Sequence, residues 1–120
     1  MDKRINKLQM MQFELMEHVQ LEGFDATQVI ADLMKHRDLW EAVVMLPDPS
    51  WGLLPLRDLG ANRWNVDCLY IYASSSDLAP LNELAQSWGP TELMWLDPEK
   101  QKDLMRVPDI PTQRVLRLFW

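Results

Sequence analysis

The feature that most constrains the fold is an alternation of strand-like and helix-like segments in the second half of the chain. Residues 65–73 (NVDCLYIYA) and 92–96 (ELMWL) are apolar at successive positions, which is typical of strands covered on both faces. Helical segments over 78–88 and 98–106 separate these strands from each other and from a final strand predicted over 113–120. Such an order is typical of crossover connections in a parallel sheet. This half of the chain is therefore predicted to be α/β.

Start and stop signals support both helical segments. Asp77 can cap the first of them, and Gly89 supplies the expected stop. Asp97 and Pro98 hold the N-cap and N1 positions that are favoured at the start of the second.

The first third of the chain predicts a helical hairpin. Residues 2–22 form the first helix of this prediction, Gly23 stops it, and Asp25 caps a second helix. The apolar positions of the first helix step by three and four and cover one broad face: Ile5, Leu8, Met11, Leu15, Met16 and Val19.

The middle segment is the most ambiguous part of the sequence. Residues 40–46 either extend the second helix or form a strand, and their valines and the following Pro47 favour a strand. A turn over 47–52 precedes a short strand predicted over 53–59, which Pro55 would confine to a sheet edge.

The predicted fold is a single domain over residues 1–120, of α/β (or α+β) class. A helical hairpin (1–38) packs on a small mixed sheet that ends in a β-α-β-α-β unit (39–120). The strand order is left open by the sequence.

Composition narrows the partner class. The 120 residues carry a formal charge of −6, which disfavours nucleic acid and anionic membranes as partners. Six Trp and eight Met slightly favour protein interfaces. Cys68 is the single cysteine, and neither a signal peptide nor an apolar stretch of membrane-spanning length is recognisable, so we expect a cytoplasmic protein.

Catalytic and cofactor motifs are missing from the sequence. HExxH, CxxC, GxSxG, P-loop and GxGxxG patterns do not occur, and the four glycines are too dispersed to form a phosphate-binding loop. Cys68 lies within a predicted strand and is interpreted as a buried, inert thiol. The sequence therefore predicts no catalytic residue, no metal site and no cofactor, and it favours a non-enzymatic protein.

Met10 and Phe13 are the first interaction candidates. Both fall outside the apolar face of the first helix and lie three residues apart, as an exposed patch for a protein partner or for self-association would. The alternative places the first helix between the second helix and the sheet, and the sequence does not decide between the two. Trp51, in the Pro-rich turn, is either a partner anchor or a cover for the edge of the core.

Trp120 is the last interaction candidate. In a strand over 113–120, Leu116, Leu118 and Trp120 share one face, whereas Arg117 lies on the other. A covered Arg117 would need a partner. The sequence therefore predicts a peripheral strand with Trp120 turned inward, and recognition of Trp120 by a partner is the less favoured interpretation.

A small-molecule or divalent-metal site is the alternative function. In a parallel sheet, Ser74, Ser75, Ser76, Asp77 and Asp97 would follow strand ends near helix N-termini, where ligands bind. Capping alone also explains the two aspartates. The leading expectation is a small interaction protein of the adaptor, inhibitor, immunity or chaperone type, homodimeric through its first helix, and the alternative is an enzyme or sensor using this strand-end site.

Overall fold

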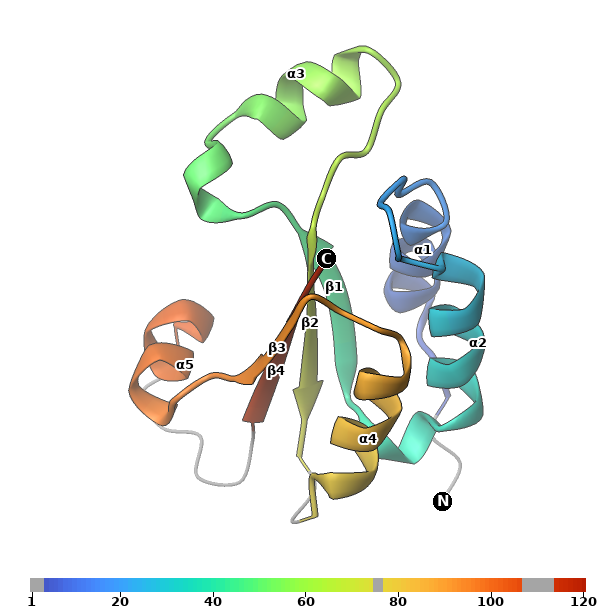
Figure 1. The fold of residues 1–120 in the computed structure, drawn as a ribbon, viewed down its shortest axis with the longest axis vertical. Coiled ribbons are helices and arrows are strands. Elements are labelled where there is room, and N and C mark those ends of the chain that lie inside the picture. The colour runs from blue at the N-terminus through green and yellow to red at the C-terminus, as the bar shows by residue number, and fades with distance from the viewer. Residues whose placement is uncertain (1–3, 75–76, 107–113) are drawn as a thin grey trace.

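The computed structural model describes residues 4–74, 77–106 and 114–120, and in them it shows five α-helices and one four-stranded sheet (Figure 1). The mixed α/β class, with the N-terminal helices preceding the sheet, is confirmed. In chain order the elements are α1 (Lys7–Met16), α2 (Ala26–Lys35), β1 (Ala42–Leu46), α3 (Leu54–Gly60), β2 (Cys68–Ala73), α4 (Ala79–Ser87), β3 (Glu92–Trp95), α5 (Pro98–Met105) and β4 (Arg114–Phe119).

The sheet is antiparallel throughout, with strand order β1-β2-β4-β3. The expected parallel pairing is therefore wrong, although the element order β2-α4-β3-α5-β4 is as predicted. β2 and β3 run in the same direction, but β4 lies between them and opposes both, which makes β2-α4-β3 a split β-α-β unit. The apolar pattern of a strand covered on both faces does not reveal the direction of its neighbours.

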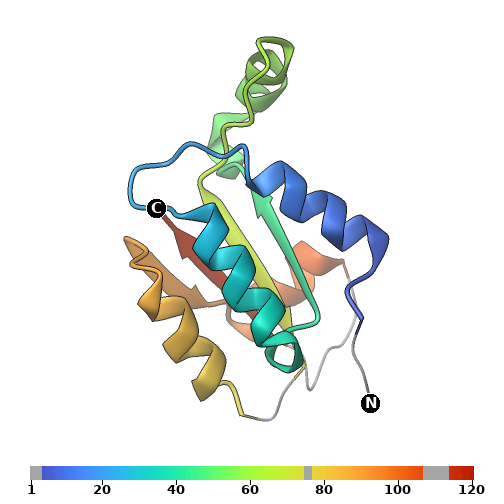
Figure 2. The same cartoon turned by 90° about the vertical axis from the view of Figure 1, so that its right-hand side faces the viewer.

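One face of the sheet carries the hydrophobic core. Figure 2 shows α1, α2 and α4 in front of this face. Alternate strand residues point toward these helices and are fully buried, because side chains alternate between the faces of a strand. The largest fully buried core side chains include Trp40, Phe13, Met16, Leu33, Met45, Leu69, Ile71, Leu81, Leu116 and Leu118.

The face that α1 turns inward differs from the prediction. Phe13 and Met16 are buried, and the Phe13 ring packs edge-on to Trp40 at 5.8 Å between centroids. Leu8 and Met11, which were assigned to the apolar face, are exposed. The helix is also shorter than predicted, ending at Met16.

Of the two strands predicted in the middle segment, the structure contains one. The strand within residues 40–46 is confirmed as β1. The strand predicted over 53–59 is wrong, since these residues enter the helix α3. Pro55 lies in the first helical turn, where its missing N–H breaks no hydrogen bond.

Candidate functional site

The second face of the sheet lies opposite the face that α1, α2 and α4 cover (Figure 2). Among the described residues, α5 is the one helix on this side (Figure 1). Gln101 of α5 is buried there, and its Oε1 accepts the backbone N–H of Val115 at 2.9 Å. The strand register places Val44, Tyr70 and Arg117 in one row across this face.

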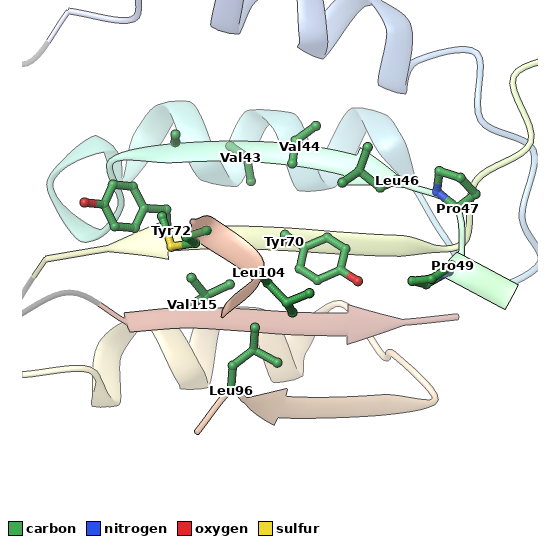
Figure 3. A pocket seen from close by; sticks show the side chains of 12 residues that line it. Val43, Val44, Leu46, Pro47, Pro49, Tyr70, Tyr72, Leu96, Leu104 and Val115 are labelled. Carbon is green, nitrogen blue, oxygen red and sulfur yellow. The ribbon is translucent and has the colours of Figure 1, made fainter. Parts of the chain in front are cut away.

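An apolar groove of about 400 Å³ lies on this face (Figure 3). Three parts of the molecule form it: the strands, the start of the arm (residues 47–67, between β1 and β2), and α5. Its lining includes Val44, Leu46, Tyr70, Tyr72 and Val115 from the strands, Pro47 and Pro49 from the arm, and Leu104 and Met105 from α5.

Two tyrosines supply the polar groups of the groove floor. Burial raises the pKa of the Tyr70 phenol, and a hydrogen bond from Arg117 opposes that rise in part. Burial also raises the pKa of Tyr72, as does the nearby Glu41 carboxylate. Both phenols are therefore neutral at physiological pH. A floor of this kind suits aliphatic or aromatic groups better than ions.

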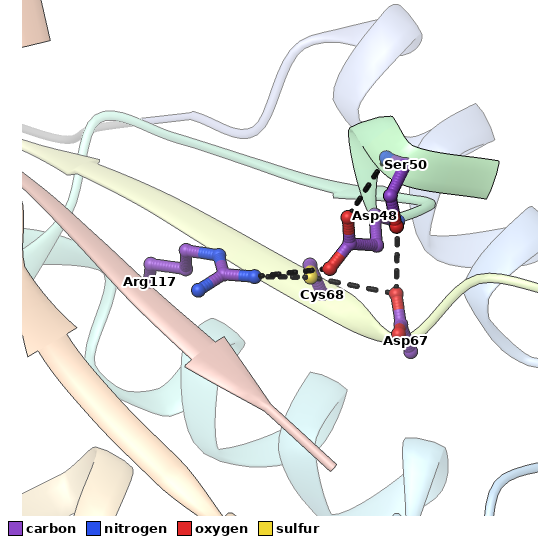
Figure 4. A network of polar contacts seen from close by, with 5 residues as sticks. All are labelled: Asp48, Ser50, Asp67, Cys68 and Arg117. Carbon is purple, nitrogen blue, oxygen red and sulfur yellow. Dashed lines mark hydrogen bonds and ion pairs between the residues drawn. The ribbon is translucent and has the colours of Figure 1, made fainter. Parts of the chain in front are cut away.

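Arg117 stands beside the groove in a polar network (Figure 4). Its Nη2 lies 3.8 Å from Asp48 Oδ2 and donates to Cys68 Sγ at 3.3 Å. Asp67 is buried, and its Oδ1 accepts the backbone N–H of Asp48 at 3.0 Å and the Cys68 thiol at 3.4 Å. The network joins the two ends of the arm to β2 and β4.

The same network explains why β4 does not lie at the periphery. The sequence predicts a peripheral strand here, and that prediction is wrong because β4 pairs with both β2 and β3. Arg117 can occupy an internal strand because Asp48, Cys68 and Tyr70 face it.

Cys68 lies at the start of β2 and is fully buried. Burial is the main cause that raises the pKa of its thiol, and the hydrogen bond from Arg117 lowers it by less. A neutral, enclosed thiol is a poor nucleophile. The inert role expected from the sequence fits this environment.

The arm carries the second notable surface, an outer stripe of leucines. Leu53, Leu56 and Leu59 are 77%, 65% and 52% exposed and recur every three residues. Leu56 and Leu59 lie in α3, and at about 100° per residue they share one side of it. Leu53 is the N-cap residue immediately before the helix. Figures 1 and 2 show α3 beyond the end of the sheet, away from the other helices.

The opposite side of α3 faces back into the arm. Leu54 and Asp58 line a cavity of about 310 Å³ together with Trp51 and Leu21. Trp51 is half-buried there. Both interpretations of Trp51, a cover for the edge of the core and a partner anchor, stay predictions.

Met10 and Phe13 do not form the exposed pair considered from the sequence. Phe13 is 2% exposed and belongs to the core, whereas Met10 is 37% exposed. Of the two alternatives left open by the sequence, the exposed patch is wrong, because Phe13 packs against Trp40 in the core. A binding role for Met10 alone stays a prediction.

Trp120 follows β4 and is half-buried. Its ring lies edge-on to Phe24 with centroids 4.8 Å apart, and Leu116 and Leu118 are buried on the helix-covered face. This placement agrees with a Trp turned toward the core.

The residues of the alternative ligand site have structural partners. Ser74 donates a hydrogen bond to Glu41 at 2.8 Å, Asp77 accepts the Ala79 N–H at the start of α4, and Asp97 accepts the Lys100 N–H at the start of α5. The other two residues, Ser75 and Ser76, lie outside the described residues. Within the described ranges, no group of three His, Cys, Asp or Glu residues is arranged to hold a metal ion.

Sequence reasoning missed the groove, and although it required a partner for a covered Arg117, it did not identify Asp48 or Cys68 as that partner. The groove joins residues from β1, β2, β4 and α5, so it depends on strand order, which the sequence leaves open. A signal for the outer stripe was present in the three-residue spacing of Leu53, Leu56 and Leu59, but the strand prediction obscured it.

Comparisons of the chain with protein-family models, curated proteins and solved structures find no significant match. In the part of the chain that the structure describes, no helix combines the length and apolar character needed to cross a membrane. The features of the described residues that bear on function are the apolar groove and the exposed leucines of the arm.

Proposed function

We propose that this chain is a non-enzymatic protein-interaction protein whose arm carries the recognition surface. The observation that carries the proposal is the outer stripe of Leu53, Leu56 and Leu59, which exposes large apolar side chains at the start of α3 and along it. Helices that dock into apolar grooves present residues with this spacing to their partners. Clustered exposure of large apolar side chains marks interaction sites more often than isolated exposure does.

The length and anchoring of the arm support the same function. Antiparallel neighbours such as β1 and β2 can be joined by a two-residue turn, so the arm over residues 47–67 is much longer than the connection requires. The arm is fixed at its base by the hydrogen bond between Asp48 and Asp67, and Asn65 donates to Asp58 at 3.0 Å. A helix held in place before binding loses less conformational entropy on docking.

The net charge and the single thiol bear on the class of partner and on the cellular location. A net charge of −6 favours a protein partner over nucleic acid or an anionic membrane. Cys68 is free and buried, which fits the reducing cytoplasm. We accordingly propose a cytoplasmic location.

Affinity capture with stripe variants tests the proposal. The tagged chain and its Leu53→Glu/Leu56→Glu variant are used as bait in cells that make the protein, and the captured proteins are quantified by mass spectrometry. Charged side chains would have to be desolvated in an apolar interface, so the variant should retain less than about a tenth of the specific partner.

The matched control is Leu8→Glu/Met11→Glu, which adds two charges at exposed apolar positions of α1. This control should keep the partner. Equal capture by wild type and stripe variant, with both folded by circular dichroism, would exclude the arm as the recognition surface.

A second function is favoured by the dimensions of the groove. Its volume of about 400 Å³ and apolar lining fall within the range of small-molecule sites, so a small apolar ligand is the alternative occupant. Melting scans with a panel of apolar compounds test it, since a ligand at about 100 times its Kd should stabilise the fold by about 2.7 kcal/mol. The shift should disappear in Leu46→Lys/Leu104→Lys, which charges the groove walls.

A further inference from the structure

We infer that the partner of the arm is a second copy of this chain, in which the outer stripe of each copy occupies the groove of the other. The inference rests on the proposed function, because it names the partner of the same surface. It would make the protein a two-fold symmetric dimer held by two identical contacts.

The groove has the size and chemistry to receive the stripe. An apolar cavity of about 150 Å³ accommodates a benzene molecule, so one of about 400 Å³ has room for two or three aliphatic side chains. Its walls are aliphatic and its two phenols are neutral, so leucines entering it leave no charge unpaired. Figure 3 shows Leu46, Leu104 and Tyr70 around this space.

The stripe and the groove are neighbours along the chain. Pro47 and Pro49, which line the groove, are also the first part of the arm that leads to Leu53. A two-fold interface requires one continuous surface on which residue i meets residue j and j meets i. A projecting stripe next to a groove satisfies this requirement when the partner is turned by 180° about an axis between them.

The five exposed leucines supply about two thirds of the apolar area that one partner buries in a standard interface. Leu46 and Leu104 of the groove are 44% and 55% exposed, in addition to the three leucines of the stripe. A fully exposed leucine side chain presents on the order of 100 Å², so these five present roughly 300 Å². A standard interface buries about 800 Å² per partner, of which about 450 Å² is apolar, and the tyrosines and prolines of the groove add to the leucines.

The arm is held away from the groove of its own chain. Its base is fixed by the Asp48–Asp67 hydrogen bond, and its inner side faces the cavity with Trp51 and Leu54. α3 lies beyond the end of the sheet (Figure 1), and the leucines of the outer stripe are exposed there. Docking between two copies would bury both the outer stripe and the groove without a change in the conformation of the arm.

Measuring the mass in solution over a wide range of concentrations tests the inference. The wild type should have twice the mass of the chain. An arm variant, Leu53→Glu/Leu56→Glu, and a groove variant, Leu46→Lys/Leu104→Lys, should each dissociate at least about tenfold more readily. The control Leu8→Glu/Met11→Glu should remain dimeric, because α1 takes no part in the contact.

Mixing the two variants gives a sharper test. In the mixed dimer, the native arm of the groove variant meets the native groove of the arm variant, and the second contact pairs Glu with Lys. The mixture should therefore form dimers that neither variant forms alone, as resolved by native mass spectrometry. Circular dichroism and thermal melting of each variant check that it is folded, as expected for substitutions at exposed positions.

Two outcomes would overturn the inference. The first is a wild type that is monomeric at every concentration, and the second is a dimer that neither the arm variant nor the groove variant weakens, whether or not the control dissociates. The proposed function fails separately. If the wild type is monomeric but the arm variant still loses a captured protein, only the identity of the partner is wrong. If the arm variant loses nothing in either experiment, the recognition surface itself is wrong.

Discussion

Gln9 takes the place of a neighbouring strand at the β1 edge of the sheet. Its Nε2 donates to the carbonyl of Val43 and its Oε1 accepts the N–H of Val43, both at 2.9 Å. Gln12 adds a hydrogen bond from the N–H of Met45 at 3.1 Å. An edge strand with unpaired backbone groups is a template for aggregation, and these two side chains occupy those groups.

Replacing Gln9 by alanine should destabilise the fold by about 2 kcal/mol, because it leaves two backbone groups of Val43 without partners at a buried position. Urea unfolding measures the change. Gln12→Ala is the control and should cost about half as much, since it removes one hydrogen bond at a half-buried position. Equal stability of the Gln9 variant and the wild type would show that water replaces the glutamine without penalty.

A second effect at the residue scale concerns Asp32 and acid. Hydrogen bonds from Gln28 and Trp88, both at 2.9 Å, lower the pKa of Asp32 against the opposing effect of burial. A pKa that is lower in the folded state contributes stability above the unfolded pKa of about 3.9, and that contribution is lost as pH falls through the folded value.

Asp32→Asn should therefore be less stable than the wild type at neutral pH, and the difference should shrink as pH falls below about 4. Unfolding free energies measured in urea between neutral pH and acid provide the comparison. Asp25→Asn serves as a control, since Asp25 caps the same helix through a single exposed hydrogen bond. A difference that stays constant with pH would assign the effect to packing instead of charge.

At the scale of elements, α1 shows how one aromatic residue sets the orientation of a helix. Phe13 lies against Trp40 in the core, and this contact turns Leu8 and Met11 to solvent. Phe13→Ala should cost about 3–5 kcal/mol, whereas Met10→Ala, at a partly exposed position, should change stability by less than about 0.5 kcal/mol. Thermal and urea unfolding of both variants make the comparison. If Phe13→Ala lowered the free energy of unfolding only slightly, Phe13 would not be a core residue, and an exposed patch of Met10 and Phe13 would again be the better interpretation.

The elements that were predictable from sequence are those with local signals. Asp25 and Asp97 accept N–H groups at the starts of α2 and α5, as capping predicts. The apolar segments around Cys68–Ala73 and Glu92–Trp95 are strands. These signals depend on neighbours in the chain, so no knowledge of the tertiary fold was needed.

The elements that were not predictable depend on distant partners. The inward face of α1 is set by Trp40, and the internal position of β4 is possible only because Asp48, Cys68 and Tyr70 face Arg117. The groove likewise requires the order β1-β2-β4-β3 and the return of α5 over it. Periodicity records that a position is apolar, but it does not record which partner covers that position.

At the scale of the whole molecule, the chain divides into a body that holds the core and an exposed arm. The buried residues of the core come from the helices and strands of the body and from the segments that connect them, with Val66 at the end of the arm. Every residue of α3 is exposed or half-buried. The arm lengthens the molecule, whose extents are 42 × 30 × 28 Å, and Figure 1 shows it at one end of the longest axis. We therefore expect the body to carry the stability of the fold, whereas the proposed recognition stripe lies on the arm.

This division predicts that the body folds without the arm. Replacing residues 50–63 by a short Gly-Ser linker keeps Asp48 and Asp67, whose hydrogen bond holds the ends of the arm together. A shorter loop has a smaller closure entropy, and the removed helix contributes no buried side chain, so the free energy of unfolding should change by about 1 kcal/mol or less. The shortened chain should also be monomeric and capture no partner.

Urea unfolding and mass in solution measure the two expectations on the same preparation. The full-length Leu53→Glu/Leu56→Glu variant is the matched control, because it keeps the arm and should share the loss of association. If the shortened chain unfolds while this variant stays folded, the half-buried Trp51 and its cavity with Leu21 contribute to the core, and the arm is part of the body. If the shortened chain folds and still dimerises, the contact between copies lies on the body, and the outer stripe is left without a function in self-association.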